Sequence, residues 1–112
     1  MDIKNSSILF DYGHLKQILA NLVSNSIDVL QKGGIIEVHS FVNNGYTEIS
    51  VSDNGPGVRD DIAVHIFNPF FTTKASGTGL GLAVCEKLCI ANNARMYFEN
   101  NKSAGCTFKI KK

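Results

Sequence analysis

Apolar residues recur three and four positions apart from Asp11 to about Lys32, which is the spacing of an amphipathic helix. The apolar stripe consists of Leu15, Ile18, Leu19, Leu22, Ser26 and Leu30. A polar stripe occupies successive turns of one flank: Gln17, Asn21, Asn25 and Asp28. Gly33-Gly34 then predicts the end of the helix. The first element therefore places amide and carboxylate side chains beside a face that is expected to be buried.

Two segments of alternating polarity follow, and they predict a β-hairpin. Ile35–Val42 and Tyr46–Asp53 read as strands, and Asn43-Asn44-Gly45 between them is a turn-forming sequence. Because side chains alternate between the two faces of a strand, Asp53 shares the face of the apolar residues two and four positions before it. An inward carboxylate at the end of a strand must find partners, since a buried unpaired charge is costly.

The remainder of the chain returns to helices and then to strands. Asn54–Gly57 predicts a turn that needs a positive φ, and Asp60-Asp61 suits the first turn of a short helix over Arg59–Phe67. The later elements are an irregular loop over 68–76, a helix from Gly77 to about Asn92 that Asn92-Asn93 can close, and strands Ala94–Glu99 and Cys106–Lys111 around a hairpin at Asn100–Gly105. This order predicts an α+β two-layer sandwich with a mostly antiparallel sheet.

Composition restricts the function classes that fit the chain. Its 112 residues make one domain, and 11 Lys and Arg against 10 Asp and Glu leave a net charge of +1. This balance predicts no strong attraction to nucleic acid or to a membrane surface. No apolar run approaches the roughly 18 residues of a membrane span, and the N-terminus lacks a signal-peptide pattern. We therefore expect a cytoplasmic domain in which phosphate binding depends on local geometry.

Cysteine and histidine positions favour neither a disulfide nor a zinc site. Cys85 and Cys89 are four apart, which is helical spacing rather than that of a CxxC pair. Together with Cys106 they are expected to be buried, reduced thiols of a cytosolic protein. The histidines are scattered along the chain, at His14, His39 and His65, and indicate no zinc site.

Three segments contain residues suited to a nucleotide and its metal ion. Asn25 could offer a carbonyl oxygen to Mg²⁺, which takes few ligands from protein and the rest from water and phosphates. Asp53 could accept from an adenine amino group and would repel the carbonyl of guanine.

The glycines of Gly77–Leu82 stand at every second position of a helix start, where backbone amides can approach a phosphate that the preceding Lys74 could also contact. This pattern is neither the dinucleotide-binding fingerprint nor a P-loop. Taken singly, the segments also fit plain structural roles: a solvated helix face, a strand ending in a turn, a glycine-rich turn and a surface charge.

The order of four segments along the chain is more specific than any one of them. The segments are Asn21–Ser26, Asp53–Gly57, Phe67–Lys74 and Gly77–Leu82. In this order they closely resemble the N, G1, F and G2 boxes of bacterial sensor histidine kinases, within the superfamily that includes gyrase, Hsp90 and MutL. The resemblance extends from Asp11 to Lys112 and implies the Bergerat-type ATP fold. That fold has a mixed, mostly antiparallel sheet, about three helices on one face and a flexible lid over ATP.

The resemblance also implies a role for individual residues. Asn25 looks like the Mg²⁺ ligand and Asp53 like the residue that reads adenine, with Gly55 and Gly57 shaping the base pocket. The residues implied to take part in catalysis are Asn21, Asn25 and Lys74. The further residues implied to contact ATP are Asp28, Phe71, Thr73, Lys74, Gly77, Thr78, Gly79, Leu80, Gly81 and Leu82. The lid is expected at about 68–76, anchored by Phe67, Phe70 and Phe71, although Phe67 suits core packing better.

Two departures from the family pattern change what is expected. ATP-hydrolysing relatives have a glutamate base one helical turn before the magnesium asparagine, where this chain has Asn21. An amide cannot act as a base at neutral pH, so weak hydrolysis and transfer to another acceptor are expected. The double glycine common after the last helix is here Asn93-Ala94, and Asn93 tolerates the left-handed turn.

The resemblance implies ATP-dependent phosphorylation of a histidine in two-component signalling. None of the three histidines sits in a phosphoacceptor setting, so residues 1–112 are expected to be the catalytic and ATP-binding part of a longer sensor kinase, of a family whose full-length members can be membrane-anchored. The expected partners are its own helical dimerisation and phosphoacceptor domain and a response regulator receiver domain. The domain alone is expected to be a monomer without nucleic-acid or membrane contacts. Two alternatives stay open: a serine kinase of the anti-sigma-factor type and a nucleotide-gated interaction module.

Overall fold

The computed structural model describes residues 9–30, 33–43, 45–69 and 81–112. The helices are α1 (Tyr12–Val29), α2 (Asp60–Ala63) and α3 (Gly81–Ala91). The strands are β1 (Ile36–Asn43), β2 (Tyr46–Asp53), β3 (Arg95–Asn100) and β4 (Cys106–Lys111). Within these residues no helix combines the length and the hydropathy that crossing a membrane requires.

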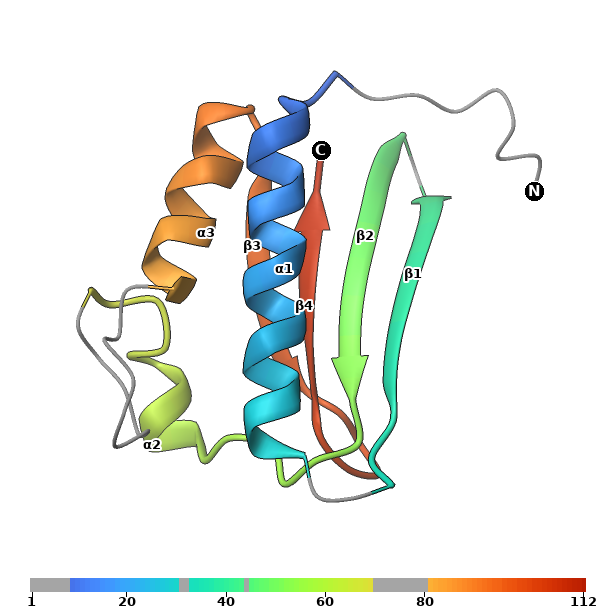
Figure 1. The fold of residues 1–112 in the computed structure, drawn as a ribbon, viewed down its shortest axis with the longest axis vertical. Coiled ribbons are helices and arrows are strands. Elements are labelled where there is room, and N and C mark those ends of the chain that lie inside the picture. The colour runs from blue at the N-terminus through green and yellow to red at the C-terminus, as the bar shows by residue number, and fades with distance from the viewer. Residues whose placement is uncertain (1–8, 31–32, 44, 70–80) are drawn as a thin grey trace.

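The four strands form one sheet in the order β1-β2-β4-β3, and all three neighbouring pairs are antiparallel. In Figure 1 the long helices α1 and α3 lie side by side against one face of this sheet, and α2 lies near the end of β2. The predicted α+β sandwich with a mostly antiparallel sheet is therefore confirmed. Parallel pairing, which a mixed sheet would require, does not occur among the described strands.

The core lies between the two long helices and the sheet. Ile18 and Leu22 of α1 are fully buried, as are Cys85 and Cys89 of α3, and β2 and β4 contribute Val51 and Phe108. The Phe108 ring packs edge-on against Phe67, with centroids 6.3 Å apart, which confirms that Phe67 is a packing residue. The three cysteines are buried and form no disulfide with one another, as expected.

The predicted strands agree with the structure more closely than the predicted helices do. β2 and β4 have the predicted limits, and β1 and β3 each lie one residue further along the chain. α1 ends at Val29, because Leu30 is already extended at φ −80° and ψ 142°, before the two glycines. Asp11 caps the start of α1 by accepting from the His14 N–H at 2.8 Å.

The helix predicted over Arg59–Phe67 is wrong in extent, since α2 covers only Asp60–Ala63 and the chain then continues in turns. α2 buries none of its residues, and the apolar residues that pack on the core, Ile66 and Phe67, lie in the turns after it. The expected turn conformations are present: Gly57 has φ 75° and Asn93 has φ 58°. The last helix is described from Gly81, and its predicted residues 77–80 lie outside the described part.

Candidate functional site

Asp53 ends β2 with a carboxylate that turns inward, as predicted, and only 5% of the residue is exposed. Its Oδ1 accepts the Gly55 N–H at 2.9 Å. Its Oδ2 accepts the Ser26 hydroxyl at 3.1 Å and the Cys106 thiol at 3.5 Å. The three donors come from α1, from β4 and from the turn after β2. All three are electrically neutral, so within the described part of the chain this buried carboxylate has hydrogen-bond donors but no cation beside it.

The backbone of Asp53 is held equally closely by the β3–β4 hairpin. The Asn101 side chain donates to the Asp53 carbonyl at 3.0 Å. Gly105 has φ 81°, and a Cβ at this position would lie 1.9 Å from the Asp53 carbonyl oxygen and 2.8 Å from Oδ1. No side chain fits there, so glycine at position 105 is what lets the hairpin approach the end of β2.

The surroundings of Gly55 and Gly57 explain why the turn after Asp53 contains glycines. Gly57 takes a positive φ, and a Cβ there would lie 2.9 Å from Asn100 Oδ1. That oxygen accepts the Val58 N–H at 2.9 Å, and the Asn100 amide donates back to the Val58 carbonyl. Gly55 is half-buried and directs its N–H to Asp53. Both glycines predicted to shape the base pocket therefore belong to the turn that directly follows Asp53.

The polar flank of α1 lies beside this junction. Asn25 precedes Ser26, the α1 residue bonded to Asp53, and both Asn25 and Asn21 are half-buried while Asp28 is exposed. Burial raises the pKa of the Cys85 thiol on α3, and a hydrogen bond with the Asn21 side chain lowers it by a smaller amount. The α1 residues predicted for the site thus share one helix flank between α3 and the end of β2.

The start of α3 is described only in part. Gly81 is its first residue and is exposed, and Leu82 packs on the core. The other residues predicted for phosphate binding lie outside the described residues, as do residues 70–76 of the predicted lid. The site residues concerned are Phe71, Thr73, Lys74, Gly77, Thr78, Gly79 and Leu80. Their roles remain predictions.

Sequence reasoning missed three residues that contact Asp53, namely Ser26, Cys106 and Asn101. Ser26 offered a signal, because it is a hydroxyl inside an otherwise apolar stripe. Burial, followed by the nearby Asp53 carboxylate, raises the pKa of Cys106 to about 12, so its thiol keeps the proton that it donates. Cys106 lies 53 residues from Asp53 in the chain, and no local pattern indicates that contact.

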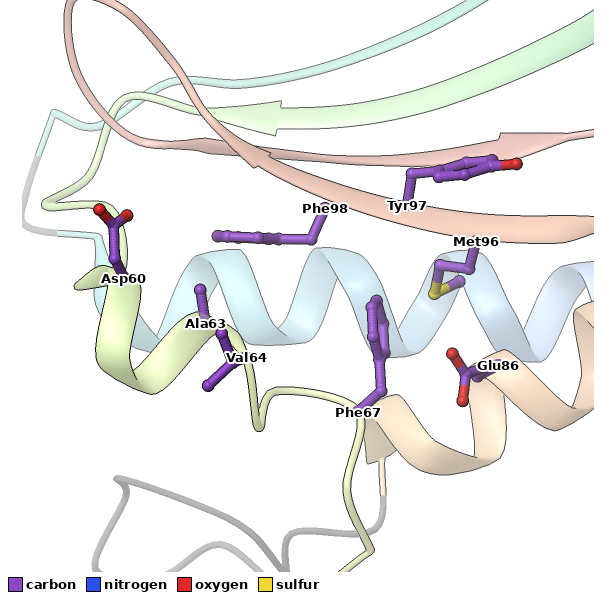
Figure 2. A pocket seen from close by; sticks show the side chains of 8 residues that line it. All are labelled: Asp60, Ala63, Val64, Phe67, Glu86, Met96, Tyr97 and Phe98. Carbon is purple, nitrogen blue, oxygen red and sulfur yellow. The ribbon is translucent and has the colours of Figure 1, made fainter.

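An open cavity of about 570 Å³ lies elsewhere, between α2, the turn after it, α3 and β3. Figure 2 shows Phe67, Met96 and Phe98 around it, with Asp60 near one end and Glu86 near the other. Among the described residues, none of those predicted to contact ATP or Mg²⁺ lines this cavity, whereas Phe67, named as a lid anchor, does. It is therefore distinct from the Asp53 junction.

The chain matches known proteins over nearly its whole length. The family model described as histidine kinase-, DNA gyrase B-, and HSP90-like ATPase matches residues 10–112. The sensor protein FixL of Bradyrhizobium diazoefficiens is 33% identical over 106 residues, which are 92% of this chain and 21% of FixL. The chain thus spans about a fifth of the length of that relative.

Solved structures with a similar fold are histidine kinases. The catalytic domain of histidine kinase ThkA aligns with a TM-score of 0.82 at 34% identity, over 93% of this chain and 68% of that one. ThkA in complex with the response regulator protein TrrA aligns at 0.77 and 29%, over 96% and 31%. Full-length ShkA in complex with AMPPNP aligns at 0.79 and 31%, over 93% and 22%.

Proposed function

Because this chain belongs to the histidine kinase-, DNA gyrase B- and HSP90-like ATPase family, we propose that it binds ATP with Mg²⁺ and donates the γ-phosphoryl group to a histidine on a separate helical domain, in two-component signal transduction. The observation that carries the proposal is Asp53, a buried carboxylate bonded to neutral donors at the junction of α1 and β2. The complex of ShkA with AMPPNP supports nucleotide binding by this fold.

The Asp53 carboxylate suits adenine as a ligand. A carboxylate offers about four acceptor positions, and described protein donors occupy three of them. The exocyclic amine of adenine is a donor and fits the remaining acceptor, whereas guanine presents a carbonyl at the same position and would be repelled. A buried site built to bond one such group discriminates strongly, because the wrong base leaves it unpaired.

Asn25 is the proposed Mg²⁺ ligand. It is a half-buried amide next to Ser26, on the flank of α1 that leads to the Asp53 junction. Mg²⁺ usually takes one or two protein oxygens and completes its shell with water and phosphates, so one amide oxygen fits its chemistry. Bound there, the ion would neutralise phosphate charge. Among the described residues, no group of three or more His, Cys, Asp or Glu side chains could hold a metal ion by itself.

The proposed reaction is transfer rather than hydrolysis, because the residue one helical turn before Asn25 is Asn21. Its amide has no basic form at neutral pH with which to activate water. Phosphoryl transfer depends mainly on positioning and charge neutralisation, so a histidine brought by another domain can act as the nucleophile. The proposed partners are the kinase's own helical phosphoacceptor domain and, through the full kinase, a response regulator receiver domain. The complex of ThkA with TrrA supports the second partner.

Labelled-ATP transfer tests this proposal directly. The chain is mixed with a separately made helical fragment of a sensor kinase, with γ-labelled ATP and Mg²⁺. We expect acid-labile, base-stable label on the fragment, and none when its acceptor histidine is replaced. Asn25→Asp should abolish transfer while the chain stays folded. Label on serine would instead support the anti-sigma-factor type of kinase, and binding of ATP without transfer to any helical fragment would support a nucleotide-gated interaction module.

A further inference from the structure

The two oxygens of the Asp53 carboxylate have different surroundings. Oδ2 faces the hydroxyl of Ser26 and the thiol of Cys106, from two elements on either side of it. Oδ1 accepts one backbone N–H, from Gly55. Each carboxylate oxygen has about two acceptor positions, so donors from the described residues saturate Oδ2 and leave one position on Oδ1.

Both donors to Oδ2 are confined to that role by burial. Ser26 is 2% exposed and Cys106 is 7% exposed, and each has a single hydrogen to donate. With a pKa raised to about 12, the Cys106 thiol remains a donor over the whole physiological pH range. The thiol bond is long and weak, whereas the hydroxyl bond has ordinary length.

An aspartate needs such constraints if only one of its oxygens is to meet a ligand. The terminal torsion of aspartate is broad and nearly two-fold, so a carboxylate without fixed donors exchanges its oxygens freely. Gly105 adds a steric constraint, because a Cβ at that position would lie 2.8 Å from Oδ1 and would crowd the oxygen with the open acceptor position. The protein therefore fills Oδ2 with two side-chain donors, whereas the residues beside Oδ1, Gly55 and Gly105, are glycines without a side chain.

We propose that Ser26 and Cys106 are positioning residues for base recognition: by occupying Oδ2 they direct Oδ1 toward the 6-amino group of the purine, and they thereby set the preference for adenine. This inference rests on the proposed function, in which Asp53 reads the base. It predicts that base selectivity depends on two side chains that do not themselves contact the base.

The test compares ATP with purine riboside triphosphate, which lacks the 6-amino group. Affinities for both are measured by calorimetry for the parent chain and for the double variant Ser26→Ala/Cys106→Ala. We expect the parent to prefer ATP by on the order of 10- to 100-fold, since the preference reports one hydrogen bond to a charged group. In the double variant the preference should fall by roughly threefold to tenfold, with a smaller change in affinity for the analogue.

Conservative and matched variants separate positioning from packing. Cys106→Ser and Ser26→Thr keep a donor and should retain the parental preference. Cys89→Ala makes the same substitution at a fully buried thiol on α3, which is not one of the donors to Asp53 named above. It should lower the melting temperature without changing the preference for ATP. Thermal unfolding of every variant establishes that it is folded.

Two results would overturn the inference. One is a folded double variant with the parental preference for ATP, which would make Ser26 and Cys106 packing residues only. The other is loss of preference in Cys106→Ser as well, which would make volume rather than donation the cause. A parent chain that fails to distinguish the two nucleotides would instead refute the proposed role of Asp53, a different outcome from either.

Discussion

Two buried carboxylates lie on β2, one on each face of the sheet, and their partners differ. Asp53 is 5% exposed and turns toward the helices, where its partners are neutral donors. Glu48 is 6% exposed on the opposite face, where its Oε1 lies 3.6 Å from Nζ of Lys111. Lys111 is the residue opposite Glu48 on β4, so a cross-strand neighbour supplies the cation.

This difference in partners marks Glu48 as a structural residue and Asp53 as a candidate ligand-binding residue. The protein neutralises Glu48 internally, and the ammonium group of Lys111 also lies 5.2 Å from the Tyr97 ring centroid, which fixes the lysine further. Among the described residues no cation lies within ion-pair distance of Asp53, and one of its acceptor positions is open. Burial alone therefore does not distinguish the two acids, but the charge of their partners does.

The largest expected effect is on stability and tests how closely the chain surrounds Asp53. Gly105→Ala would place a Cβ 1.9 Å from the Asp53 carbonyl oxygen, so we expect a loss of more than about 4 kcal/mol in the free energy of unfolding, or no folding. Gly45→Ala is the matched control, because Gly45 has nearly the same φ, 83°, with no atom within 4 Å of a Cβ. It should cost only about 1–2 kcal/mol. Equal costs by urea unfolding would show that φ strain, not contact with Asp53, explains Gly105.

A smaller effect should separate the two acids by stability. Glu48→Gln leaves Lys111 without its partner and should cost about 1 kcal/mol, less at high salt, since the lysine is partly exposed. Asp53→Asn removes a buried charge beside which the described residues place no cation, and should leave the free energy of unfolding unchanged or raise it by up to about 1 kcal/mol. Urea unfolding without nucleotide checks both variants. A larger loss for Asp53→Asn than for Glu48→Gln would contradict the distinction.

The smallest effect is a dependence of stability on alkaline pH. The pKa of Cys106 is raised to about 12 in the folded chain, so the folded state holds its thiol proton where the unfolded state, with an ordinary thiol pKa, has lost it. The contribution of the Cys106 thiol to the free energy of unfolding is complete below the thiol pKa of the unfolded chain and is lost as the pH rises toward 12. Cys106→Ser should therefore weaken the fall in stability above about pH 9, measured by unfolding at pH 8 to 11. An unchanged slope would mean that the thiol is not the group that titrates.

How far the sequence predicted the structure depends on how local each feature is. Strand β2 was predicted to the residue because its alternation ends at a turn sequence. The helix over Arg59–Phe67 was predicted too long. Asp60 and Asp61 favour a start, but α2 ends at Ala63, and Ile66 and Phe67 pack on the core from the turns that follow it. Helix ends depend on caps that the apolar period does not encode.

The candidate site divides in the same way. The inward position of Asp53 followed from the two-residue period of a strand, and Gly57 followed from the positive φ that the turn requires. The contacts of Asp53 with Ser26 and Cys106 could not be predicted, because these residues lie 27 and 53 positions away in the chain and meet Asp53 only through the packing of α1 and β4. Tertiary contacts of this kind leave no periodic trace in one sequence.

Titration of ATP into the parent chain, Asp53→Asn and Glu48→Gln, followed by calorimetry in the presence of Mg²⁺, tests the role of Asp53 most directly. Asp53→Asn should weaken ATP binding by about 10- to 100-fold, because one hydrogen bond to a charged group is lost, and Glu48→Gln should stay within about twofold of the parent. Unchanged ATP affinity in a folded Asp53→Asn chain would contradict the assignment of Asp53 as the residue that reads adenine.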